Sequence, residues 1–190
     1  MQRRSWGLLL IAILIASECR AQSIGLFFDA DGATCSANIP ANGSGHLYIL
    51  GITGGGVAGG ITGAEFVVTG FPAGWFANIV PNPASNLQFG TPLNTVGCNI
   101  AFPTCQTGSL ILLYTIDFFA TTLVSNQYVA VHMRNPPLNS NFSCPLMTQC
   151  GFPYSIVCGT GGAAIINPTG PGCTVAVENT TWSRMKRLYD

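Results

Sequence analysis

The sequence predicts an all-β protein with the architecture of an antiparallel, immunoglobulin-like β-sandwich, and three observations support this. Short runs of apolar and β-branched residues alternate with clusters of Gly, Pro and Asn, helical periodicity is almost absent before residue 180, and only 7% of the residues are charged. Short strands separated by turn residues are typical of sandwiches and barrels. Because 48% of the residues are hydrophobic, a disordered chain is excluded.

Nine segments carry the strand pattern. In residues 127–134, Val129 and Val131 point to one face of the expected strand, while Tyr128 and His132 point to the other. Residues 109–119 are apolar on both faces, which predicts a central strand that is covered on both sides. The predicted strands are residues 24–28, 46–52, 62–69, 75–80, 99–102, 109–119, 127–133, 154–157 and 163–166.

The first 21 residues predict a secretory signal peptide. Arg3 and Arg4 form its basic start, an apolar run covers residues 8–16, and Ala21 is a small residue at the expected cleavage position. The apolar run spans only ~14 Å of helix, which is too short for a bilayer core of roughly 30 Å. We therefore expect an exported chain, located outside the cell or in its envelope, with a sandwich domain over residues 22–177 and no membrane span after cleavage.

Charge is too sparse for a nucleic-acid binder. Residues 22–177 hold one basic side chain, Arg134, against four acidic ones. Binding to nucleic acid needs many Lys and Arg side chains that displace counterions from phosphates. This class of partner is therefore excluded, and a protein or a glycan at the cell envelope remains as the expected partner.

Seven cysteines follow Ala21, and in an oxidising compartment they predict disulfides. Because seven is odd, at most three bridges form within one chain. Their spacing does not suit zinc, and no cofactor is predicted. Residues 134–153 are predicted to form an irregular, proline-rich connection. Four cysteines lie in this connection or after it, which suggests two bridges in the last third of the chain. The other three cysteines compete for a third bridge. The seven are Cys35, Cys98, Cys105, Cys144, Cys150, Cys158 and Cys173.

Two sets of side chains are candidates for a metal site or a catalytic site. Asp29 and Asp31 resemble the start of a calcium loop, but the loop lacks its later acidic ligands, and Asp-Gly after a strand is first a turn signal. Asp117 and His132 can meet if their strands are adjacent, yet no nucleophile motif accompanies them. The sequence therefore predicts no metal site and no enzyme.

An aromatic cluster surrounds the Pro-Ala-Gly segment at residues 72–74. Phe71, Trp75 and Phe76 can form an exposed platform for sugars or for a hydrophobic partner. The alternative is that this loop folds Trp75 into the core.

The last segment, residues 178–190, predicts a short amphipathic helix. Thr181 can cap it, and Trp182 would face the body or a partner. The basic side chains would be exposed; they are Arg184, Lys186 and Arg187. Such a tail either covers one end of the sandwich or serves as a recognition tag for envelope sorting or partner docking.

Two strand segments carry a family resemblance. Residues 63–72 (GAEFVVTGFP) and 109–116 (SLILLYTI) resemble the strands of cohesin-type and related immunoglobulin-like bacterial sandwiches. Residues 62–190 also resemble secreted bacterial proteins with a Cys-rich segment, a Thr-Gly-Gly turn and a similar tail. The resemblance implies architecture only and transfers no binding site. Cys98 is an addition to the shared pattern, so we expect three disulfides with Cys98 unpaired.

The leading interpretation is therefore an exported, disulfide-stapled β-sandwich that acts as a binding or surface-structural module. The alternative is a secreted carbohydrate-binding or carbohydrate-active domain that uses Phe71, Trp75 and Phe76 together with an acid such as Glu65.

Overall fold

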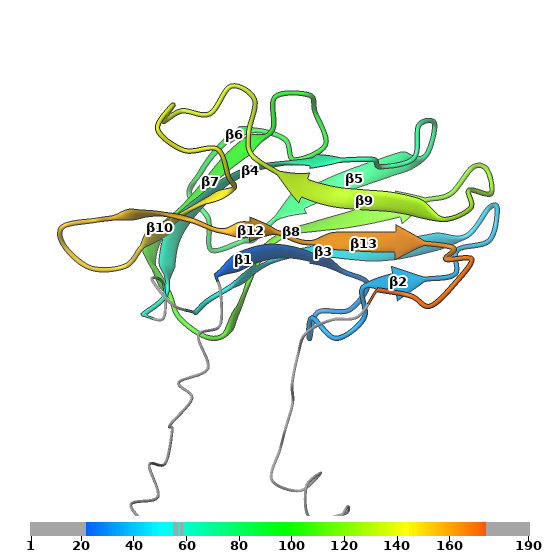
Figure 1. The fold of residues 1–190 in the computed structure, drawn as a ribbon, viewed down its shortest axis with the longest axis horizontal. Helices are drawn as coiled ribbons and strands as arrows, with labels where there is room; N and C mark the ends of the chain where they lie inside the picture. The colour runs from blue at the N-terminus through cyan, green and yellow to red at the C-terminus, as the bar shows by residue number, and fades with distance from the viewer. Residues whose placement is uncertain (1–21, 55–56, 58, 174–190) are drawn as a thin grey trace, which may run out of the picture.

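The computed structural model describes residues 22–54, 57 and 59–173, which fold into two β-sheets packed face to face (Figure 1). The all-β sandwich predicted from the sequence is confirmed. No helix within the described ranges is long and apolar enough to cross a membrane. The predicted signal peptide (1–21) and the predicted tail helix (178–190) lie outside the described residues.

The first sheet has the strand order β12-β1-β3-β8-β5. Its centre is the antiparallel pair β3 and β8, and β1 is antiparallel to β3 but parallel to β12. The strands are β1 (Ser23–Phe27), β3 (Ser44–Ile52), β5 (Phe76–Pro81), β8 (Leu110–Phe119) and β12 (Thr160–Gly161).

The second sheet has the order β11-β10-β4-β9-β13-β2, with β7 paired to β4 and β6 paired to β7. The first half of β4 pairs with both β7 and β10, and its last residues pair with β9. The strands are β2 (Ser36–Ala37), β4 (Ile61–Thr69), β6 (Leu87–Gly90), β7 (Cys98–Gln106), β9 (Gln127–His132), β10 (Leu146–Gln149), β11 (Ile156–Cys158) and β13 (Ala163–Ile166).

The core lies between the sheets, where alternate residues of the central strands meet. Leu47, Ile49 and Ile116 from the first sheet and Phe66 and Val129 from the second are fully buried. Burying each such side chain contributes roughly 1.5–3 kcal/mol. All nine predicted segments overlap with strands, although the segment predicted at 154–157 shares only Ile156 and Val157 with β11.

The prediction of an irregular connection over residues 134–153 is wrong in one part. Residues 146–149 form β10, which pairs with β4 on one edge and with β11 on the other. Leu146 and Met147 are buried there, and this burial stabilises the strand despite the surrounding prolines. The rest of the segment forms a loop that rises over one end of the second sheet (Figure 1).

Three disulfides staple the sandwich, and the predicted pattern of two bridges within the C-terminal third is wrong. The long bridge joins Cys35 to Cys173, across 138 residues of sequence. The crossing bridge joins Cys105, in β7, to Cys150, and the hairpin bridge joins Cys144 to Cys158. Only the hairpin bridge lies wholly within the cysteine-rich segment, because Cys35 and Cys105 are far from that segment in the sequence.

Cys98 is a free, fully buried cysteine. Its thiol lies between the two sheets, where burial raises the pKa of Cys98 from 9.0 to about 12. Burial also raises the pKa of the neighbouring Tyr114 hydroxyl above its ordinary value. Both groups are therefore protonated at neutral pH, and Cys98 behaves as a small core residue.

Candidate binding site

A groove of about 520 Å³ runs across the outer face of the second sheet. It crosses β6, β7, β4, β10 and β11. The labels of β6, β7 and β10 lie toward the same end of the molecule in Figure 1. Large apolar side chains line it. Leu146 is buried, and the exposed ones are Leu87, Phe89, Leu138, Tyr154 and Ile156. A volume of this size falls within the range of about 300–1,000 Å³ that is typical of ligand pockets.

The shape of the groove follows from residue sizes along one row of paired residues. Leu87 pairs with Ala101, Ala101 with Gly63, Gly63 with Thr148, and Thr148 with Ile156. Because side chains at paired positions share a face of the sheet, the row has large residues at its ends and small ones in the middle. The sequence therefore builds a trough whose deepest part lies over β4 and β7.

The next row places a carboxylate in the floor of the groove. Phe89 pairs with Asn99, Asn99 with Glu65, and Glu65 with Leu146. Only 6% of Glu65 is exposed. Its Oε2 accepts a hydrogen bond from Asn99 Nδ2 (2.7 Å), and its Oε1 accepts one from the backbone N–H of Leu138 (3.0 Å). These two bonds offset part of the cost of burying a carboxylate.

The floor is rich in hydrogen-bond acceptors. A carboxylate offers about four acceptor positions, and the described groups use two of those on Glu65. The side-chain oxygen of Asn99 is buried and has no partner among the described residues. The acceptor positions that remain on Glu65 suit a ligand that brings an N–H donor, and above all a cationic one.

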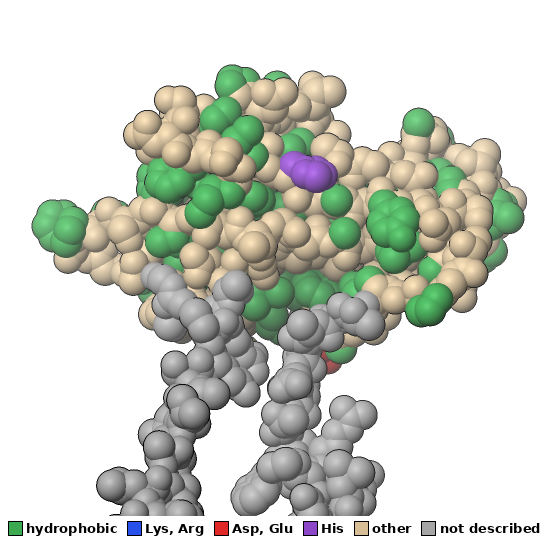
Figure 2. Space-filling model, in the orientation of Figure 1, with side chains coloured by type: hydrophobic (Ala, Val, Ile, Leu, Met, Phe, Trp, Pro, Cys, Tyr) green, Lys and Arg blue, Asp and Glu red, His purple; other side chains and the backbone are tan. Residues whose placement is uncertain are grey.

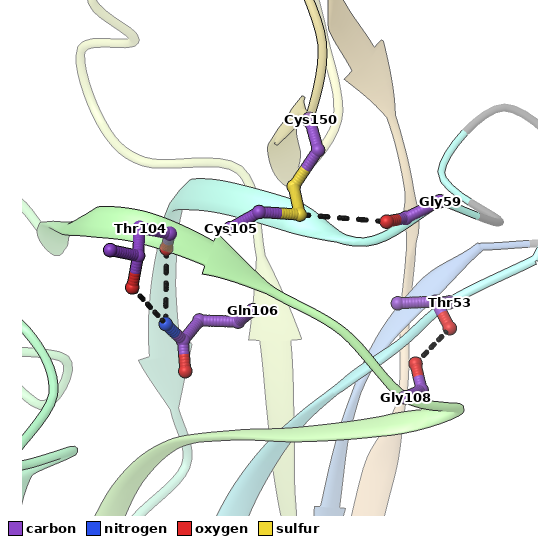
Figure 3. Close-up of a disulfide and its surroundings, with 7 residues drawn as sticks. All are labelled: Thr53, Gly59, Thr104, Cys105, Gln106, Gly108 and Cys150. Carbon is purple, nitrogen blue, oxygen red and sulfur yellow. Dashed lines mark hydrogen bonds between the residues drawn. A yellow bond between two sulfur atoms is a disulfide. The ribbon is translucent and has the colours of Figure 1, made fainter.

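Two disulfides brace this groove. The crossing bridge ties the end of β7 to the residue after β10, so it joins the two strands that flank the start of β4 (Figure 3). Sγ of Cys105 lies near the carbonyl oxygen of Gly59, just before β4 (3.5 Å). The hairpin bridge ties the start of β10 to the end of β11. The groove is therefore held in shape before any partner arrives, which lowers the entropic cost of binding.

Of the two arrangements that the sequence allows for Phe71, Trp75 and Phe76, the structure has the one in which Trp75 enters the core, and the three do not form an exposed platform. Trp75 is only 7% exposed, its indole N–H donates to the carbonyl of Thr122 (3.0 Å), and its ring stacks on Phe118. Phe71 is half-buried and packs edge-on against the same two rings. Of the three, Phe76 alone is well exposed. The loop folds Trp75 into the core because burial of the ring is favourable and the indole N–H finds a partner there.

The expected meeting of Asp117 with His132 is also wrong. His132 lies on β9 in the second sheet, whereas Asp117 lies on β8 in the first. Asp117 instead pairs across strands with His46, and the Nδ1 of His46 lies 2.7 Å from the carboxylate.

The weak calcium candidate does not assemble a metal site. Asp29 Oδ1 accepts the backbone N–H of Ala33 (2.8 Å), which closes a turn that contains Asp31. Across residues 22–54, 57 and 59–173, no group of three or more His, Cys, Asp or Glu side chains could hold a metal ion. The tail residues Trp182, Arg184, Lys186 and Arg187 lie outside the described part of the chain.

Sequence reasoning missed most of the groove. Leu87 and Phe89 belong to a strand that was not predicted, and Leu138 and Tyr154 lie in loops. Glu65 follows the alternation of β4: Phe66 beside it faces the core, so Glu65 faces outward. The hydrogen bond from the Leu138 N–H to Glu65 joins residues 73 positions apart, so no local sequence pattern could predict it.

No protein-family model matches the chain, and no curated protein matches it in sequence. Among solved structures it is similar to the seventh ScaB type I cohesin from Pseudobacteroides cellulosolvens, at 10% identity with a TM-score of 0.49, over 80% of this chain and 95% of that chain. It is also similar to the cohesin module of a Clostridium perfringens family 33 glycoside hydrolase, at 8% identity with a TM-score of 0.48, over 78% of this chain and 98% of that chain. The expected resemblance to cohesin-type sandwiches is confirmed, and it concerns the arrangement of strands.

Proposed function

We propose that this protein is an exported, non-enzymatic binding module that holds a partner protein in the groove on its second sheet. The observation that carries the proposal is a buried carboxylate, Glu65, in the floor of an exposed apolar trough. The partner would be a protein segment that places an apolar side chain between Phe89 and Tyr154 and a Lys or Arg side chain near Glu65.

The apolar surface of the groove supports a protein partner. Exposed Leu, Phe, Tyr and Ile side chains lie next to one another along the groove, and contiguous apolar patches of this kind mark interaction sites. Aromatic side chains at the rim, here Phe89 and Tyr154, contribute strongly to binding because they bury a large area with few rotatable bonds.

Charge supports a basic group in the partner. The described residues hold four acidic side chains and one basic side chain, so the body carries a net negative charge at neutral pH. Figure 2 shows a face dominated by hydrophobic and uncharged polar groups, with acidic and basic colours almost absent. A buried carboxylate in the floor of an apolar groove favours a cation at short range.

The three disulfides support export, because such bonds persist outside the cell or in the envelope and are rare in the cytosol. Together with the signal peptide expected at residues 1–21, they favour a role at or beyond the cell surface.

The experiment uses the mature chain and a random peptide library displayed on phage. We expect enriched peptides to combine an apolar residue with a nearby Lys or Arg. Fluorescence anisotropy should then show binding at least roughly tenfold weaker for Glu65→Gln, which removes the charge but keeps the size, and for Tyr154→Ala. Tyr128→Ala is the matched control, since Tyr128 is similarly exposed but lies on β9 away from the groove.

The proposal is wrong if no peptide is enriched over a surface without protein, or if Tyr128→Ala weakens binding as much as Tyr154→Ala. Enriched peptides without basic residues, bound equally by Glu65→Gln, would overturn the role given to the carboxylate. Circular dichroism and the melting temperature establish that each variant is folded.

A further inference from the structure

A polar row crosses three strands on the outer face of the first sheet. His46 on β3 pairs with Asp117 on β8, and Asp117 pairs with Asn78 on β5. The Asp117 carboxylate lies 2.7 Å from His46 Nδ1, and its other oxygen accepts a hydrogen bond from Asn78 Nδ2 at 3.4 Å. The His46 and Asp117 side chains remain 60% and 40% exposed. The three planar groups are therefore held in place and still reach solvent.

An aromatic row lies beside the polar row on the same face. Two residues further along β8, Phe119 pairs with Phe76 on β5 and with Ser44 on β3. Phe76 is 70% exposed and Phe119 is 40% exposed. A shallow cavity of about 330 Å³ lies over this surface, lined by residues of both rows. These two adjacent Phe side chains leave an apolar patch in contact with water.

The two rows together match the chemistry of a sugar ring. A pyranose has hydroxyl groups along its edge, which both donate and accept hydrogen bonds, and C–H groups on its face. Asp117 accepts, Asn78 both donates and accepts, and the remaining ring nitrogen of His46 does either according to its tautomer. The exposed face of Phe76 offers a flat apolar surface for the C–H face of the sugar.

We propose that this face is a second binding site, for a neutral saccharide, with Phe76 as the stacking residue and Asp117 as the central acceptor of hydroxyl groups. The net negative charge of the described body disfavours an acidic glycan. The site lies on the opposite sheet from the groove and does not depend on the function proposed for it. The module would then hold a glycan on one face and a protein on the other.

The experiment screens the mature chain against an array of neutral oligosaccharides, including cellohexaose, chitohexaose, xylohexaose and mannohexaose, and measures hits by isothermal titration calorimetry. We expect binding to at least one sugar. Phe76→Ala and Asp117→Asn should each weaken that binding roughly tenfold or more, because they remove the stacking surface and the charged acceptor respectively. Phe89→Ala is the matched control: it removes a similarly exposed Phe from the groove and should leave sugar binding unchanged.

A second measurement needs no variant. In the wild-type protein labelled with ¹⁵N, titration of the sugar should shift amide resonances of residues 44–46, 76–78 and 117–119 and leave those of β6 and β7 in place. The proposal is overturned if no neutral sugar binds, if the shifts fall elsewhere, or if Phe89→Ala is as harmful as Phe76→Ala. Peptides selected on phage that lose binding in Phe76→Ala would overturn it in favour of a protein partner.

Discussion

Removing the three disulfides one at a time should destabilise the protein in the order of the loops that they close. A bridge restricts the unfolded chain, and the loss of entropy grows with the logarithm of loop length. The long bridge closes 138 residues, the crossing bridge 45 and the hairpin bridge 14. These lengths correspond to about 5, 4 and 3 kcal/mol of unfolding free energy at 25 °C. The difference between the first and last is therefore about 2 kcal/mol, which exceeds the usual error of such measurements.

The assay is equilibrium unfolding of the mature chain in guanidinium chloride at pH 7, with each bridge replaced by a pair of alanines. Far-UV circular dichroism reports the loss of strands, and the intact protein and Cys98→Ala serve as references. We expect the midpoint to fall least for the hairpin-bridge variant and most for the long-bridge variant. Equal losses of unfolding free energy, or a larger loss for the hairpin-bridge variant, would refute the explanation by unfolded-chain entropy. Such a result would indicate that contacts of the bridges in the folded state determine their contribution to stability.

Three further predictions concern single side chains. The unfolding free energy should fall by roughly 2 kcal/mol between pH 9 and pH 10.5, because folded Cys98 keeps its proton to about pH 12 while the unfolded thiol loses it near 9.0. Tyr114, whose pKa is also raised, adds to this loss at higher pH. The measurement is the urea midpoint, which should converge between wild type and Cys98→Ala as the pH rises. Asn167→Ala should cost about 2–4 kcal/mol in urea unfolding, since its amide makes three hydrogen bonds to backbone groups and its backbone has a φ of 51°. Trp75→Phe should lower stability by about 1–3 kcal/mol, because the carbonyl of Thr122 loses its donor, and a melting temperature equal to wild type would contradict this.

The strand content was predictable because inward-facing residues are apolar along most strands. In β9, Val129 and Val131 are buried while Tyr128 and His132 are exposed, as the alternation indicated. The strand β6 was missed because all four of its residues are exposed, so no alternation marks it. The strand β10 was missed because it is four residues long and lies between Pro145 and Pro153.

The candidate sites were less predictable, because they depend on pairing between strands. Phe76 was singled out from the sequence, but its neighbour on the sheet is Phe119, 43 positions away, rather than Trp75 beside it. The prediction of disulfide connectivity was wrong for the same reason, because the pairing depends on which segments lie side by side in the fold. Cys173 is close in sequence to Cys158, yet its partner, Cys35, lies near the opposite end of the chain.

The long bridge also determines how the sandwich responds to mechanical load. Residues 36–172 lie inside the covalent loop that joins Cys35 to Cys173. A pulling force applied at residues 22 and 173 would therefore pass through the sulfur–sulfur bond and bypass most strands. Under tension only residues 22–34, which include β1, could extend, by at most about 45 Å, before the bond carried the load. The strands that carry the groove and the two rows on the first sheet all lie inside the covalent loop, so they would stay folded under such a load.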